Sequence, residues 1–390
     1  MRQTKLKSII LNFTPSWFSI NMGTGILSIL LMIAPHQFPG EKYIGIALYF
    51  INIALFLLFL CFTISRNIMF PWVLKLLLRH PTQCMFIGTL PMGLATIVNA
   101  TLLIAVPKYG DWAIILSHVL WWIDVAITIV IVTAIPLLMF EAHKLTLQSM
   151  TAAWLLPVVP AVVAASSGAL LATVLPVAQA KICIVVSYVL WGMGLGLATL
   201  ILALYLHRIT IHSLPNAEVI VSAFLPLGPM GQGSYGIVQL GKASKMVLSD
   251  SDMLHGTSTG EVIEIVTTLT GLLLWGFGLW WLCHGIFSVT IRALKNKMPF
   301  NMGFWGFIFP LGAYTSATII LAGQLNSAFL YILSLVFLIC LVILYLVIMG
   351  LTLRNVFNAT LFKAPCLADM DLSAPSQIEN HNMDALDASR

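Results

Sequence analysis

Ten apolar stretches recur along the chain, and they constrain its fold more than any other feature. Each is long enough to cross about 30 Å of hydrocarbon at about 1.5 Å per helical residue. Only 8% of the residues are charged, whereas soluble domains carry roughly 25%. The sequence therefore predicts an all-α integral membrane protein with ten transmembrane helices. They are expected at residues 15–34, 43–64, 83–106, 112–136, 151–175, 180–206, 217–241, 260–287, 302–323 and 328–352.

The distribution of basic residues predicts the orientation of these helices. An even number of spans places both chain ends on one side of the membrane, and the side richer in Lys and Arg faces the cytoplasm. Most of the 19 Lys and Arg residues fall on the side of the N-terminus, so both termini are predicted to be cytoplasmic. The chain then divides into a cytoplasmic N-terminus at 1–14, a ten-helix membrane domain at 15–352 and a polar, acidic, disordered tail at 353–390.

The odd-numbered spans share a proline, or an asparagine in the first span, at an equivalent place. The intervals between these positions are 70, 66, 69 and 84 residues, which indicates five copies of a two-helix hairpin. Proline kinks a helix and frees a backbone carbonyl, which membranes tolerate only beside protein or a water-filled cavity. We therefore expect a quasi-fivefold arrangement, in which the odd-numbered helices form an inner ring around a pore. The kinks are expected at Pro91, Pro157, Pro226 and Pro310.

The residue before each of these positions is apolar, and the five side chains are expected to meet at one level. Such a constriction can gate a pore by excluding water. Phe309, the aromatic member, is the expected gate, and the other members are Ile20, Leu90, Leu156 and Leu225. Uncharged polar residues of the inner helices are expected to line the pore. They are Asn21, Thr24, Ser28, Thr96, Asn99, Gln232, Ser234, Thr315 and Ser316.

Asp124 is the strongest candidate for an ionisable group inside a span. Such groups are costly in a membrane and often functional, so Asp124 could couple proton movement to transport; the alternative is a structural hydrogen-bond anchor. The Cys and His spacings do not match a zinc site, and the nucleotide-binding and nucleophile motifs lack their structural context. No catalytic residue, metal or cofactor is predicted. Scattered basic residues predict no nucleic-acid partner.

Several segments resemble a known transporter family over roughly residues 10–352. The Pro-x-Gly inner helices and the Phe before the last proline are similar to the family of the plant slow anion channel, the bacterial tellurite-resistance protein and the fungal malate permease. Within it, fungal sulfite efflux pumps look most similar. The segments that carry this resemblance are 12–18, 119–124, 163–168 and above all 227–234, which reads Leu-Gly-Pro-Met-Gly-Gln-Gly-Ser.

The resemblance implies a pore through five inner helices that Phe309 occludes, in a homo-oligomer that is a trimer in the bacterial relative. The expected function is therefore export of sulfite or bisulfite across the plasma membrane, down the electrochemical gradient. The alternative is a malate, C4-dicarboxylate or other small-anion transporter or channel, with proton coupling left open. A basic residue inside the pore would favour a dicarboxylate. A membrane enzyme would need clustered His, Asp or Cys near one membrane face, and the sequence has no such cluster.

Overall fold

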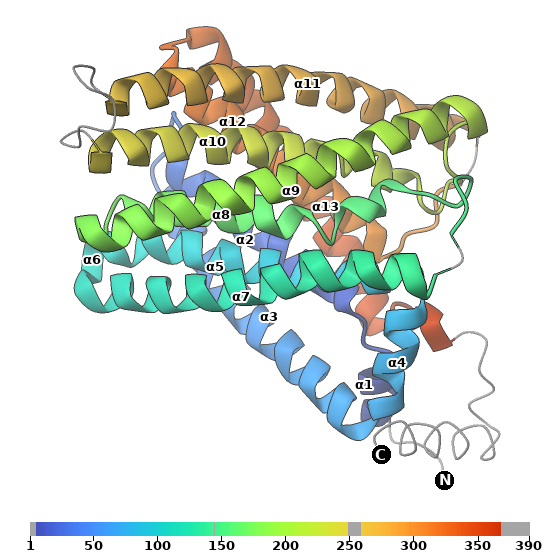
Figure 1. Cartoon of the computed structure of the whole chain (residues 1–390). Coiled ribbons are helices and arrows are strands. Elements are labelled where there is room, and N and C mark those ends of the chain that lie inside the picture. Colours follow the sequence, from blue (N-terminus) through green and yellow to red (C-terminus); the bar gives the residue numbers. More distant parts are fainter. Residues whose placement is uncertain (1–4, 144, 249–258, 296, 368–390) are drawn as a thin grey trace.

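The computed structural model describes residues 5–143, 145–248, 259–295 and 297–367. Within these ranges all regular structure is helical, which confirms the all-α prediction (Figure 1). Eight helical segments of the described chain are long and apolar enough to cross a membrane. The fold is therefore that of a helical integral membrane protein.

Five long helices form the outside of the bundle. At most 39% of the most apolar window of each helix is buried, so most of their side chains are free to face lipid. Each coincides with an even-numbered expected span. They are α3 (Glu41–Met69), α7 (Asp111–Glu141), α9 (Val177–His212), α11 (Thr259–Lys295) and α13 (Ala328–Phe357).

The odd-numbered expected spans form the inside of the bundle, and each consists of a short 3-10 helix followed by an α-helix. The 3-10 helices are η1 (Pro15–Trp17), η2 (Cys84–Gly88), η3 (Ala152–Leu155), η4 (Ile220–Phe224) and η5 (Met302–Phe307). The α-helices are α2 (Phe18–Ile33), α5 (Thr89–Ile104), α8 (Val159–Ala172), α10 (Leu227–Leu248) and α12 (Ile308–Gln324). Expected spans 151–175 and 217–241, which hold α8 and α10, are not among the eight candidates. The reason for α8 is its length of 14 residues.

The inner helices pack as a closed ring. α2 contacts α5, α5 contacts α8, α8 contacts α10, α10 contacts α12, and α12 returns to α2. Each inner helix also packs against the outer helix that follows it in the chain. Helices approach closely at Gly231, where a Cβ atom would lie 2.6 Å from the backbone nitrogen of Tyr314. The five hairpins therefore surround a common centre.

The four prolines lie where the 3-10 helices become α-helices. Pro91 and Pro310 are the third residues of α5 and α12, while Pro157 and Pro226 lie between the 3-10 helix and the α-helix that follows. The first turn of an α-helix does not need the missing N–H group, so proline fits there without breaking a hydrogen bond. Each inner segment thus changes its helical form at the proline level.

Short helices cover the end of the bundle from which the 3-10 helices enter. Helix α1 (Lys5–Leu11), amphipathic α4 (Pro71–Arg79) and η6 (Pro365–Leu367) meet through Leu11, Trp72 and Leu367, and α6 (Val106–Tyr109) lies at the other end (Figure 1). Phe362 stacks on Trp17 with ring centroids 5.1 Å apart, so the first part of the expected tail folds against the bundle. The remainder of that tail, 368–390, and residues 1–4 of the N-terminus lie outside the described residues.

Candidate functional site

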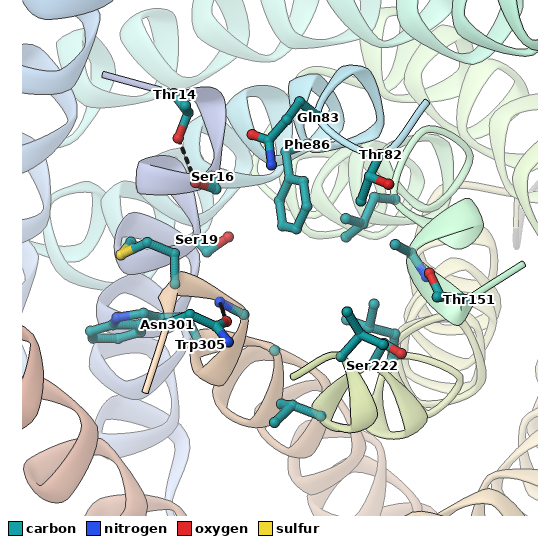
Figure 2. Close-up of a pocket in the computed structure, with 18 of the residues that line it drawn as sticks. Thr14, Ser16, Ser19, Thr82, Gln83, Phe86, Thr151, Ser222, Asn301 and Trp305 are labelled. Atoms are coloured by element: carbon teal, nitrogen blue, oxygen red, sulfur yellow. Dashed lines mark hydrogen bonds between the residues drawn. The ribbon is translucent and has the colours of Figure 1, made fainter. Parts of the chain in front are cut away.

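A cavity of about 510 Å³ enters the ring from the end that carries the 3-10 helices. All five inner segments line it, so it lies on the common axis of the bundle. Figure 2 shows polar side chains around the open centre. Those from the five segments and the loops before them are Thr14, Ser16, Ser19, Thr82, Gln83, Thr151, Ser222 and Asn301.

The cavity ends at the level of the aligned prolines. Its deepest lining residues are within two positions of Asn21 or of the equivalent proline. They are Met22, Met92, Val159, Gly228 and Pro310, together with Leu156, Leu225 and Phe309. Phe309 is only 4% exposed, so its ring lies among packed side chains at the closed end.

Three of the five residues expected at the constriction line this cavity: Leu156, Leu225 and Phe309. Leu90 instead lines a smaller, separate cavity beside Phe13, and Ile20 lines neither of the two cavities. Met22 and Met92, two positions further along their helices, contribute to the cavity in their place.

The walls of the cavity are mostly neutral, with hydroxyl and amide groups between apolar side chains. Thr14 and Ser16 share a hydrogen bond of 2.7 Å, and Asn301 accepts one from the backbone of Gly303 at 2.8 Å. The buried Oε1 of Gln83 and Oγ of Ser222 have no hydrogen-bond partner among the described residues. A buried polar group without a partner costs free energy, so these two groups are available to water or to a polar solute.

Five of the nine polar residues expected along the path instead join the inner ring to the outer helices. Asn21 donates to the backbone and side-chain oxygens of Asn52 in α3 at 3.1 and 3.2 Å, and Asn52 in turn donates to Thr96 at 3.0 Å. The hydroxyl groups of three others bond to Tyr345, Gly45 and Gly271 on outer helices. These are Thr24, Ser28 and Ser234.

Other polar residues lie on the helix faces that continue from the cavity. Asn99 follows Met92 by seven residues, and Gln232 follows Gly228 by four. Residues spaced in this way share one face of an α-helix, so both lie beyond the closed end of the cavity on its own axis. Asn99 is 7% exposed, and its buried Oδ1 has no partner in the described chain.

Two serines, Ser166 and Ser316, lie at the same level of the axis as Asn99 and Gln232, and these four residues form the polar level. Ser316 follows Phe309 by seven residues, and Ser166 follows Val159 by seven. Gln232 donates its side-chain N–H to the hydroxyl of Ser166, which links α10 to α8. Ser166 was not among the expected residues, although the same spacing of seven could have identified it. Thr315 bonds to the carbonyl oxygen of Leu311 in its own helix.

Asp124 lies away from this axis, on outer helix α7. It is 1% exposed, and neither carboxylate oxygen has a hydrogen-bond partner among the described residues. Helix α7 packs against α5 and α8, and Trp121, one turn before Asp124, donates to the carbonyl oxygen of Ala164 in α8 at 2.9 Å. Within the described chain, no three His, Cys, Asp or Glu side chains gather as they would around a metal ion.

The segment after α13 lines the cavity, although the sequence predicted a disordered tail there. Thr360, Leu361, Lys363 and Pro365 line its mouth. The backbone N–H of Ala364 donates to the side-chain oxygen of Asn12 at 3.1 Å, which holds the segment against the N-terminal residues. Lys363 and Glu218 are the charged residues among the lining of the cavity. The polar composition of the tail gave no signal for this folding.

Several known proteins are similar to this chain over most of its length. The family model described as voltage-dependent anion channel matches residues 12–353. The sulfite efflux pumps of Arthroderma benhamiae and Trichophyton rubrum are each 42% identical, over 91% of this chain and 93% of theirs. The malic acid transport protein of Schizosaccharomyces pombe is 24% identical over 81% of this chain and 72% of its own length.

Proposed function

The chain belongs to the voltage-dependent anion channel family, and from that premise we propose that it exports sulfite or bisulfite across the plasma membrane. The observation that carries this proposal is the axial cavity, to which all five inner segments contribute and which closes at Phe309. The extent and identity of the match to the two fungal sulfite efflux pumps support sulfite as the anion. The match to the family model confirms the family that the inner-helix motifs indicated.

In this proposal the bundle spans the membrane ten times as five quasi-equivalent hairpins. The closed ring of inner helices supports the arrangement, because each hairpin contributes one inner and one outer helix. The cavity mouth faces the cytoplasm, since the positive-inside rule puts the 3-10 ends and both termini there. Lipid surrounds the outer helices, and the working unit is a homo-oligomer, a trimer by family resemblance, in which every protomer has its own path.

Phe309 is the proposed gate, with Leu156, Leu225, Met22 and Met92 around it. An apolar constriction excludes water and therefore blocks an anion until the side chains move apart. The polar level beyond it then supplies neutral hydrogen-bond donors from the side-chain amides of Asn99 and Gln232, while the hydroxyl groups of Ser166 and Ser316 donate to carbonyl oxygens of their own helices. Weak, multiple sites of this kind let an anion pass without trapping it.

An electrochemical gradient is the proposed driving force. An inside-negative potential favours the exit of a monovalent anion by about 2.3 kcal/mol per 100 mV. Asp124 lies outside the inner ring, which favours uniport over proton coupling. Dicarboxylate transport is the alternative, supported by the 24% identical malic acid transport protein and by Lys363 at the cavity mouth, which could pair with a carboxylate.

The proposal is tested by anion flux in proteoliposomes that contain the purified full chain. Sulfite, nitrate, chloride and malate are compared at equal concentration, with and without a pH gradient, and protein-free liposomes are the control. We expect sulfite to be the fastest of the four and malate to be slow. Faster malate than sulfite would establish the dicarboxylate alternative, and no flux of any anion would refute the proposed function.

A further inference from the structure

One inner helix is longer than the other four. Helix α10 continues for 22 residues beyond Pro226, whereas the others end 12 to 15 residues beyond the equivalent asparagine or proline. At about 1.5 Å per residue, α10 therefore extends roughly 10 Å past the rim that its neighbours form. Figure 1 shows this end of α10 beside the start of α11. This rim is the outer mouth of the proposed pathway.

A polar stripe follows α10 along its full length. Gly228 lines the cavity, and Gln232, Tyr235, Gln239 and Lys242 follow it at intervals of three or four residues. Such intervals place all five on one face of the helix. Gln239 donates to the hydroxyl of Tyr235 at 3.2 Å, which ties two members of the stripe together.

Two glycines show which way this face points. On one side of the stripe lies Gly231, where a Cβ atom would be 2.6 Å from the backbone of Tyr314 in α12. On the other side lies Gly236, where a Cβ atom would be 3.1 Å from the Cβ atom of Ser166 in α8. Because α8 and α12 are the neighbours of α10 in the ring, the face between these contacts points to the axis.

Lys242 is the last residue of the stripe and its only charged member. It lies 16 residues beyond Pro226, just past the ends of the other inner helices, and about 24 Å along the axis from the gate level. Its side chain is half-buried. Within the described chain, the carboxylate of Glu264 is bound to Lys245 at 2.7 Å and to Gln324 at 3.1 Å. The same carboxylate attracts Lys242 electrostatically, but no hydrogen bond or ion pair ties Lys242 to it.

We infer that Lys242 forms an anion-binding site at the outer mouth, which takes a small oxyanion as it leaves or enters the axis. This inference rests on the proposed function. A half-buried ammonium group at the end of the axis raises the local concentration of anions. It lies outside the hydrophobic centre, so it attracts the anion without holding it at the gate. The path is thus neutral in its middle and positive at its outer end.

The test is uptake of labelled sulfite into spheroplasts that express the full chain, where the outer mouth faces the medium. At low ionic strength, Lys242→Gln should raise the half-saturating external sulfite concentration on the order of tenfold, and Lys242→Arg should resemble wild type. The difference should shrink when an impermeant salt screens the charge. Lys181→Gln is the matched control, because Lys181 is an exposed lysine near the start of outer helix α9; it should leave the half-saturating concentration unchanged.

A second variant tests whether the charge at position 242 controls sulfite uptake. Lys242→Cys is treated from outside with a cationic or an anionic thiol reagent, and wild type, which has six cysteines of its own, receives the same treatment. The cationic reagent should restore uptake and the anionic one should lower it further. Equal kinetics of Lys242→Gln and Lys181→Gln, or no effect of reagent charge, would overturn the inference. Absence of sulfite uptake by wild type would instead refute the proposed function, and nitrate would then probe Lys242.

Discussion

Replacing Phe309 by alanine should open the closed end of the cavity. The substitution removes about 100 Å³ of side chain, the share of roughly three water molecules at about 30 Å³ each. Phe309 lines the closed end of the cavity and precedes Ser316 by two helical turns. The space left by its ring would therefore connect the water of the cavity to the polar level beyond. If the connection lowers the barrier by about 1.4 kcal/mol or more, flux rises at least tenfold.

The assay is stopped-flow sulfite flux in liposomes, normalised to folded protein. Phe307→Ala is the matched control, since Phe307 belongs to the same segment but packs against Phe224 with ring centroids 4.8 Å apart and does not line the cavity. Both variants lose a largely buried ring and should lose stability, by up to about 3–5 kcal/mol. Only Phe309→Ala should gain flux. An unchanged or lower rate in folded Phe309→Ala protein, or an equal gain in both variants, would refute the gate assignment.

Three further substitutions separate the axis from its surroundings. Gln232→Leu should lower sulfite flux several-fold because it removes a donor from the polar level; wild-type flux in the folded variant would remove Gln232 from the path. Asn21→Leu should instead lower the midpoint of thermal unfolding, with a cost of about 1–2 kcal/mol from the lost bonds to Asn52, and should change flux per folded protein little; a large loss of flux would place Asn21 on the path. Asp124→Asn should retain transport driven by membrane potential, and abolished transport would indicate obligatory proton coupling.

The repeated proline positions indicated which helices form the inside of the bundle, but not by the expected route, because these prolines lie in or before the first helical turn and free no interior carbonyl. In four of the five odd-numbered segments a proline marks the change from 3-10 to α-helix, and the inner helices contact one another in a ring. The even-numbered helices, whose apolar surfaces are largely exposed, were equally recognisable. These features are local in sequence, because backbone chemistry and lipid contact act on each helix separately.

The direction of single polar side chains could not be predicted. Inner helices are buried on every side, so polar residues toward the axis and those toward an outer helix occur in the same sequence context. Asn21 binds Asn52 of α3, whereas Gln232 lies on the axial face of α10 and binds Ser166. The length of α10 was also missed, because the expected span ended at residue 241, one residue before Lys242.

The central claim is that sulfite crosses the axis of the five inner helices down its electrochemical gradient. The most direct measurement is sulfite exit from proteoliposomes under an imposed potassium diffusion potential, and separately under a pH gradient at zero potential. An inside-negative potential of 100 mV should drive a monovalent anion outward to a concentration ratio of about 50, and Phe309→Ala should reach that ratio faster. The pH gradient alone should do no more than change the fraction present as bisulfite. Accumulation of sulfite against its own electrochemical gradient, driven by protons alone, would contradict the account.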